Sequence, residues 1–323
     1  MISEWESPIS RAQKAILSLS DVLGRPLPES VAYSENHALR LLHDAELCDE
    51  ISARLRLPSS GAGDDTVCRW LYDTFHSMDP ALQLAVLRFV PTIAGVYLPR
   101  AAARRPLPGY EAVLLALYAH ETTARGDQPV TVTVPDLCRP SVYHEGAGAA
   151  TGGELAVGVI SPTLEPHGAV RATKRARIVG VALEMYCSKV CLMPARSKVD
   201  FCEFCLAWAG PTSARDEAAK EGGRIPLPWE LIQPSLRILG HCLMGTSDAG
   251  EVQDKAAAAV RGLLARATLD VDTRAILATR SLLRAWEMAA CSTKRWPDLD
   301  FLLEDPPSEG DATRELLPSP SLA

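Results

Sequence analysis

Length, composition and charge limit the classes of protein to which this chain can belong. It has 323 residues, of which 47% are hydrophobic, enough for a large core in one elongated domain or two closely packed ones. Its formal net charge of -7 argues against a general nucleic-acid binder that neutralises phosphates. Its nine cysteines are scattered and odd in number, which indicates a reducing compartment, so we expect a cytosolic protein.

We expect no segment of this sequence to target or anchor it to a membrane by itself. The first residues lack the basic and apolar parts of a signal peptide, and Ile2 stands where myristoylation requires a glycine. The most apolar run covers residues 81–98. Gln83, Arg88 and Pro91 interrupt it, which favours a buried helix followed by a break over a membrane span. Any membrane attachment should therefore depend on another protein.

Hydrophobic periodicity predicts a series of amphipathic helices in the first part of the chain. The first two, residues 8–24 and 30–55, can form a helical hairpin. Asp65 and Asp79 stand where N-cap residues of the next two helices are expected, because a short acidic side chain accepts hydrogen bonds from the first backbone amides. We expect Pro91 to break the helix that begins after Asp79.

The hydrophobic pattern changes its period after a helix predicted over residues 110–125. Valines alternate with threonines in residues 129–134, and hydrophobic residues alternate again in residues 154–160. This period of two predicts one small antiparallel strand pair. The loop between the strands, residues 138–153, is rich in glycine and alanine and is expected to be mobile.

The longest and most apolar helical pattern lies within residues 171–210. Apolar residues cover more than half of the circumference of its first helix and leave a narrow polar stripe that contains Glu184 and Ser188. Such a helix must be packed on several sides. A second, short helix follows, for which Asp200 and Glu203 have the spacing of a capping box. We interpret this block as the centre of the core.

Three more helices are predicted, over residues 228–245, 251–268 and 272–291. The fold class is therefore mainly α: an elongated multi-helix domain of residues 1–305 with one small antiparallel strand pair. Residues 306–323 are rich in proline, serine and acidic residues, and we expect a disordered tail there.

Four cysteines of the central block superficially match a zinc framework, since they form the pairs Cys187-x3-Cys191 and Cys202-x2-Cys205. Both pairs fall inside helical patterns and lack the glycine-bearing knuckle turns of zinc sites. We therefore predict buried structural cysteines that bind no metal. A zinc-dependent enzyme is an alternative that rests on these four residues alone.

Motifs for catalysis are incomplete. His120 and Glu121 begin a metalloprotease-like string, but Ala124 stands where a second histidine is required. His144 beside Glu145 has the chemistry of a base and its orienting group, yet no nucleophile is in sight. The glycines of the loop miss the spacing of a dinucleotide fingerprint. We expect a protein that is not an enzyme, with no cofactor and no small-molecule substrate.

Four cations, Arg171, Lys174, Arg175 and Arg177, gather at the start of the central helix of an otherwise acidic chain. Positive charge at that end opposes the helix dipole. One interpretation is that they contact an acidic partner surface or anionic lipid headgroups. The other, which we favour, is that internal salt bridges and solvent neutralise them.

Several sequence blocks appear in order over roughly residues 65–285. They are ALQL (81–84), PTIAGVYL (91–98), EAVLLALYAHETTAR (111–125), ISPTLEPHG (160–168), RARIVGVALE (175–184), DFCEFC (200–205), IPLPWEL (225–231), LRILGHCL (236–243) and AILATRSLL (275–283). With these blocks the chain resembles the hyccin family, most closely its plant members. A whole-domain resemblance of this kind is more specific than any one short motif.

The resemblance implies a non-catalytic scaffold or regulatory subunit of the plasma-membrane phosphatidylinositol 4-kinase alpha complex, which supports phosphatidylinositol 4-phosphate synthesis. Implied partners are a tetratricopeptide-repeat scaffold and the kinase, while a separate membrane-anchoring subunit recruits the assembly. The chain would then be cytoplasmic and peripheral at the inner face of the plasma membrane through its partners. The family offers no catalytic or metal residues to transfer.

The alternative function is a free-standing helical adaptor of HEAT or armadillo type, suggested by the last helix pair. No fixed repeat period runs through the chain, and the predicted strands do not fit a solenoid. For the scaffold-subunit interpretation, we expect the partner to contact the terminal helical hairpins, residues 8–55 and 251–291. A terminal hairpin has only one neighbour that can bury its apolar residues, so some should remain exposed for a partner.

Overall fold

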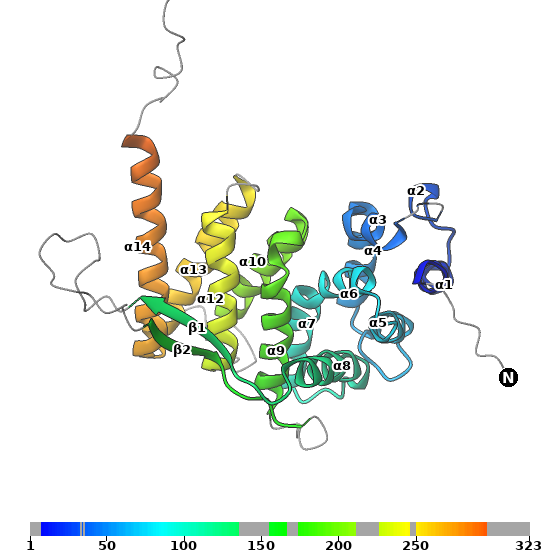
Figure 1. Ribbon diagram of the computed structural model, residues 1–323, viewed down its shortest axis with the longest axis horizontal. Coiled ribbons are helices and arrows are strands. Elements are labelled where there is room, and N and C mark those ends of the chain that lie inside the picture. Colours follow the sequence, from blue (N-terminus) through cyan, green and yellow to red (C-terminus); the bar gives the residue numbers. More distant parts are fainter. Residues whose placement is uncertain are drawn as a thin grey trace, which may run out of the picture. The chain divides into compact units, whose positions relative to one another are not determined.

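The computed structural model describes residues 8–32, 34, 36–135, 155–166, 174–210, 226–245 and 250–295. Within this part of the chain it contains thirteen α-helices, one short 3-10 helix and two strands (Figure 1). The predicted mainly helical fold with one small antiparallel strand pair is therefore confirmed. The predicted mobile loop and the predicted disordered tail lie outside the described residues.

The chain divides into two compact units, Met1–Leu283 and Arg284–Ala323, and the boundary falls within the last helix. The features described below belong to the first unit, except for the C-terminal part of that helix.

The N-terminal helices are shorter than predicted. They are α1 (Pro8–Leu23), α2 (Glu29–Ala32), α3 (His37–His43) and α4 (Ala45–Arg56). The prediction of one helix over residues 30–55 is wrong because Asp44 has an extended backbone, with φ -74° and ψ 107°. Its carboxylate accepts a hydrogen bond from the amide of Leu47 at 2.8 Å and so begins a new helix.

The next helices begin as predicted from their acidic caps. Asp65 accepts hydrogen bonds from the amides of Val67 and Cys68, at 2.8 and 3.1 Å, and Asp79 makes the corresponding contacts in the following helix. The elements are α5 (Thr66–His76), α6 (Pro80–Leu87), α7 (Val90–Ala102) and α8 (Pro108–Arg125).

Pro91 does not end a helix, contrary to the prediction. It lies in the first turn of α7, where a missing amide proton costs nothing, and the break falls just before it. The helices α6 and α7 form a pair bent by 46° that has the length and composition of a broken membrane span, whereas no single described helix is long and apolar enough to cross a membrane. Leu82, Val86 and Ile93 of this pair are buried within the protein.

The strands β1 (Val130–Pro135) and β2 (Leu155–Ser161) pair antiparallel, and each begins and ends one residue later than predicted. Thr133 lies opposite Val157, and Val130 lies opposite Ser161 with an irregularity next to it. The valine side chains of both faces are exposed: Val132 and Val134 are 41% and 42% exposed, and Val157 and Val159 are 64% and 62% exposed. We call this pair the β-hairpin.

The central helix α9 (Arg175–Ser188) is buried over most of its length and packs against α7, α8 and α12, as its apolar circumference predicts. A 3-10 turn, η3 (Val190–Leu192), leads to α10 (Ala195–Ala209). The predicted capping box is wrong: α10 begins after Pro194, so Asp200 lies inside the helix. Its buried carboxylate pairs with Arg56 at 3.0 Å, a partner distant in sequence.

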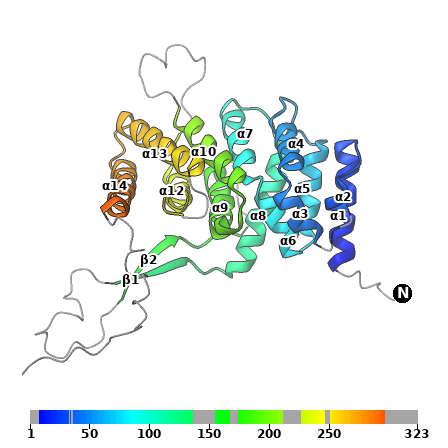
Figure 2. The same ribbon diagram turned by 90° about the horizontal axis from the view of Figure 1, so that it is seen from above.

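The last helices are α12 (Trp229–Met244), α13 (Glu251–Leu269) and α14 (Thr273–Arg295), near their predicted positions. α13 packs against α10 and α12, and α8 lies between α5 and α9 (Figure 2). The helices α9 and α12 approach so closely that a Cβ at Gly180 would lie 2.5 Å from the backbone oxygen of Glu230. The core is therefore formed around α9 by helices from both halves of the unit.

Candidate functional site

The predicted cation cluster lies at the start of α9, and three of its members contact carboxylates of the same chain. Lys174 pairs with Glu165. Arg175 lies 3.5 Å from a carboxylate oxygen of Glu111. Arg171 lies outside the described residues. These contacts leave the predicted role in partner or lipid binding untested, because a partner can still compete for exposed ion pairs.

The fourth cation, Arg177, belongs to a cluster around the buried Glu184 side chain that we call the Glu184 junction: Arg125, Ser161, Arg177 and Glu184. Glu184 Oε2 accepts hydrogen bonds from Arg125 Nη2 and Ser161 Oγ, both at 2.8 Å. Arg177 Nη1 lies 3.6 Å from Glu184 Oε1, and Arg177 Nη2 donates to Ser161 Oγ at 3.1 Å. The junction fixes the end of β2 to α8 and α9.

In the Glu184 junction, hydrogen bonds to carboxylates outweigh the effect of burial on the pKa of Arg125. Burial alone would lower the pKa of Arg125, but its hydrogen bonds to Glu184 and Glu121 outweigh that effect and raise the pKa. Arg125 therefore stays charged, and Glu184 of the polar stripe predicted on the central helix belongs to a buried ion-pair site, whereas Ser188 is exposed. The role of this site is structural, because the guanidinium groups of Arg125 and Arg177 both contact the carboxylate of Glu184 within the protein.

The four cysteines of the predicted zinc alternative lie in different surroundings. Cys202 and Cys205 are buried on α10, whereas Cys187 is half-buried on α9 and Cys191 is exposed in η3. A hydrogen bond with Cys242, together with burial, raises the pKa of the Cys202 thiol, and burial raises the pKa of Cys205. Among the described residues, no three metal-binding side chains gather around one point. Metal analysis remains the direct test.

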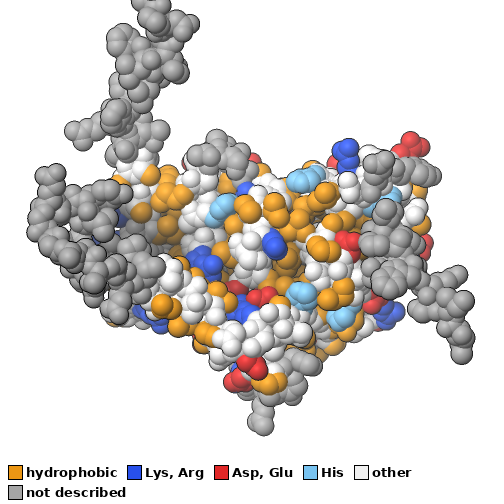
Figure 3. Space-filling view, viewed as in Figure 1, with side chains coloured by type: hydrophobic (Ala, Val, Ile, Leu, Met, Phe, Trp, Pro, Cys, Tyr) orange, Lys and Arg blue, Asp and Glu red, His pale blue; other side chains and the backbone are white. Residues whose placement is uncertain are grey.

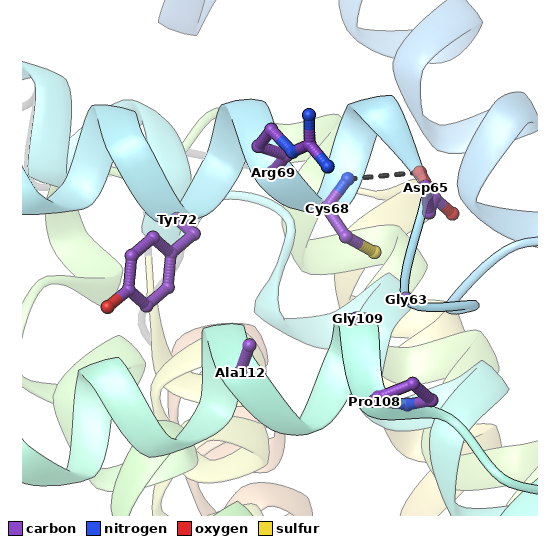
Figure 4. A pocket seen from close by; sticks show the side chains of 8 residues that line it. All are labelled: Gly63, Asp65, Cys68, Arg69, Tyr72, Pro108, Gly109 and Ala112. Atoms are coloured by element: carbon purple, nitrogen blue, oxygen red, sulfur yellow. Dashed lines mark hydrogen bonds between the residues drawn. The ribbon is translucent and has the colours of Figure 1, made fainter.

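A small cleft between α5 and α8, with a volume of about 220 Å³, contains one thiol (Figure 4). The side chain of Cys68 points from α5 towards Gly109 in the first turn of α8, while Arg69 points away. Burial, with the nearby charge of Asp65, raises the pKa of this thiol, so Cys68 is protonated at neutral pH. It packs against the backbone and lacks the thiolate that a nucleophile requires.

A larger hollow of about 450 Å³ lies where α3, α5, α6, α8 and α9 meet, and we call it the central groove. Buried side chains form its floor: Phe75, Leu87 and Met185. Leu39 and Leu192, which are 41% and 52% exposed, form part of its rim. Figure 3 shows hydrophobic side chains gathered on this face, between the segments labelled α9 and α3 in Figure 1.

Five of the thirteen residues that line the central groove are polar, among them Gln83 and Ser188. The ring of His120 meets the ring of Phe75 edge-on, with centroids 5.3 Å apart. Glu121 is neutralised by Arg125, whose Nε lies 2.7 Å from its carboxylate. Lys189 is exposed and has no carboxylate within 4.0 Å among the described residues. The groove is thus mainly apolar, with one uncompensated positive charge at its rim.

Comparison with protein families gives a match to the model described as Hyccin, over residues 32–297. The chain belongs to the hyccin family. This match confirms the family resemblance found in the sequence blocks, and it includes every residue of the central groove and of the Glu184 junction. Helix α1 lies before the matched part.

The terminal helices of this hyccin-family chain carry exposed apolar side chains, as expected for a surface that meets a partner. Leu17 on α1 is 51% exposed and Leu277 on α14 is 70% exposed. The predicted N-terminal hairpin consists of four helices rather than two, so its exposed residues are distributed over α1 and α3. These positions are candidates for partner contacts alongside the central groove.

Sequence reasoning missed the central groove. Its rim residues Leu39 and Leu192 belong to segments far apart in the chain, and each fits an ordinary amphipathic pattern. The one local signal is Lys189 next to an apolar turn, and that signal is common in surface loops. Only the packing of α3 on α6, of α5 on α6 and α8, and of α8 on α9 brings these residues together.

Proposed function

We propose that this hyccin-family protein is a non-catalytic scaffold or regulatory subunit of the plasma-membrane phosphatidylinositol 4-kinase alpha complex. In that role it stabilises the complex and supports phosphatidylinositol 4-phosphate synthesis. The family match over residues 32–297 carries the proposal. The closer likeness to plant members, seen in the sequence blocks, is part of the same proposal.

The proposed partners are a tetratricopeptide-repeat scaffold and the kinase, with a membrane-anchoring subunit reached through the complex. The chain would be cytoplasmic and would lie at the inner face of the plasma membrane through these partners. It would require no cofactor, nucleic acid or small-molecule substrate. We assign these interactions to a domain of residues 1–305, with residues 306–323 as its tail.

Exposed apolar residues on the terminal helices support a scaffold contact there. Large apolar side chains left in solvent are a common feature of subunits whose partner covers them. Leu17 and Leu277 have this character. Truncating such an anchor typically costs about 2 kcal/mol or more of binding energy, enough to remove a subunit from a complex.

The cation cluster has a secondary place in the proposal, as a contact with an acidic partner or with anionic lipid. Lys174 and Arg175 each contact a carboxylate of this chain, so a partner must displace those ion pairs. Exposed pairs of this kind contribute at most about 1 kcal/mol, which a multivalent acidic surface can exceed.

Co-expression with the scaffold and the kinase tests the proposed function. The wild-type chain should co-purify with both proteins and increase lipid-kinase product at the membrane. Leu17→Glu and Leu277→Glu should each reduce co-purification at unchanged melting temperature, whereas Leu115→Glu should not. Leu115 is a matched control because it is 39% exposed on α8, outside the terminal helices. A wild-type chain that joins neither protein would contradict the proposed function.

A further inference from the structure

The central groove has the size and lining of a site for a few apolar side chains. Its volume of about 450 Å³ lies within the usual range of binding pockets. Phe75, Leu87 and Met185 form a buried apolar floor, while Leu39 and Leu192 remain exposed at the rim. Covering Leu39 and Leu192 removes their apolar surface from water, which favours an occupant with an apolar face.

The walls of the groove determine the backbone conformation of a protein occupant. They come from helices and from the turn η3, whose backbone groups do not form a strand edge. Within the described residues, the only strands are β1 and β2 of the β-hairpin, and no residue of the β-hairpin lines the groove. An extended peptide would find no ladder of backbone partners there, whereas a helix satisfies its own backbone.

Charge at the rim determines what should flank that apolar face. Lys189 has no carboxylate partner among the described residues, and Glu121 already pairs with Arg125. His120 is the other ionisable group of the lining, and its ring packs against Phe75. An incoming carboxylate therefore gains a partner at Lys189, while an incoming cation meets a like charge.

We propose that the central groove is a docking site for an amphipathic helix of a partner protein. The helix places apolar side chains spaced i, i+3 or i+4, and i+7 over Phe75, Leu87 and Met185, and an acidic residue beside Lys189. The groove shares Leu39 of α3 with the N-terminal helices, but Leu17 and Leu277, the positions that test the scaffold contact, do not line it. The occupant is defined by its chemistry alone.

Site-specific photocrosslinking in cells tests this site with a defined probe. The full-length chain carries p-benzoylphenylalanine in place of Leu192, and a control chain carries it in place of Val157, which is 64% exposed on the β-hairpin. Mass spectrometry then maps the crosslinked segment. A segment with apolar residues at helical spacing and an acidic neighbour, captured from position 192 and not from position 157, supports the proposal.

Every other crosslinking result overturns it. A second copy of this chain, a basic or extended segment, a lipid, or no product at position 192 would each be incompatible with the proposed occupant. Normal assembly with the kinase together with any of these results would leave the proposed function intact. The two proposals therefore fail separately.

A synthetic peptide of the mapped segment then measures the role of charge. Fluorescence anisotropy with the purified full-length chain should show that Lys189→Glu weakens binding about tenfold, equivalent to about 1.4 kcal/mol, and removes most of its salt dependence. Leu192→Glu should weaken it further, while Val157→Glu should have no effect. Equal affinity of the peptide for the wild-type chain and both groove variants, all with unchanged melting temperature, would contradict the proposal.

Discussion

Helix α9 and the β-hairpin are both rich in valine, yet the protein uses them in opposite ways. Val179 and Val181 of α9 are fully buried, whereas Val157 and Val159 of the β-hairpin are 62–64% exposed. Helix α9 has three helices around it, and the β-hairpin has solvent on both faces. An apolar sequence thus indicates that burial is possible, and the number of neighbours decides whether it occurs.

The two regions meet at the Glu184 junction, and among the variants expected to fold, loss of its charge balance should have the largest effect. Glu184→Gln leaves Arg177 without a carboxylate and Arg125 with Glu121 alone, in a site where Glu184 is only 8% exposed. Breaking a buried ion pair in this way costs about 3–5 kcal/mol. Urea denaturation should show a loss of this size in the free energy of unfolding.

The exposed pair between Lys174 and Glu165 provides the control for that measurement. Both side chains are about half exposed, so Glu165→Gln should cost less than about 1 kcal/mol. Equal losses for Glu165→Gln and Glu184→Gln would mean that the junction does not behave as a buried site.

Gly180 in α9 and Gly158 in β2 allow the tightness of packing in the two regions to be compared. A Cβ at Gly180 would lie 2.5 Å from Glu230 O, so Gly180→Ala must push α9 and α12 apart and should cost about 1–3 kcal/mol. A Cβ at Gly158 in β2 would lie 3.5 Å from Val132, an ordinary contact, so Gly158→Ala should be neutral or slightly stabilising. Differential scanning calorimetry should show a lower melting temperature for the first variant alone.

Ser161 is the point at which the β-hairpin is attached to the helices. Ser161→Ala removes an acceptor from Arg125 and Arg177 and a donor from Glu184, which should cost about 1–2 kcal/mol. Amide hydrogen exchange in β1 and β2 should become faster, while exchange in α9 should change less. Unchanged exchange in both strands would show that other contacts hold the β-hairpin in place.

The smallest effect is expected on the outer face of the β-hairpin. Val157→Lys combined with Val159→Lys should change the melting temperature by no more than a few degrees, because both side chains are already in solvent. Val181→Lys should prevent folding, since its side chain is fully buried in α9. A folded Val181→Lys protein, or an unfolded double variant, would reverse the comparison.

Much of the fold could be predicted from local pattern. The helices near residues 110–125, 228–245 and 251–268 followed from periodicity, and Asp65 and Asp79 followed from cap chemistry. Errors arose where a local hydrogen bond or a distant partner overrode the pattern. Asp44 divides an apolar-periodic stretch by capping α4, and Asp200 is drawn into a helix interior where it pairs with Arg56.

The interaction surfaces were harder to predict than the fold. The four cations were visible in the sequence, but the carboxylates that meet three of them lie on other elements, at Glu111, Glu165 and Glu184. The central groove requires three segments of the chain to come together, and periodicity does not encode which helices become neighbours. The local hydrophobic pattern identifies the apolar faces of helices, but the packing of the helices determines which of those faces remain exposed to solvent.

The turn η3 has a practical consequence for studying the central groove. Of the seven cysteines whose surroundings the structure describes, Cys191 alone is exposed, and it directly precedes Leu192 at the groove rim. A thiol-reactive dye should therefore label Cys191 in the native protein once Cys138 and Cys291 have been replaced by serine. The emission of the attached dye should shift when a helix covers the rim. Cys191 is therefore a natural attachment point for a fluorescent reporter of binding in the central groove.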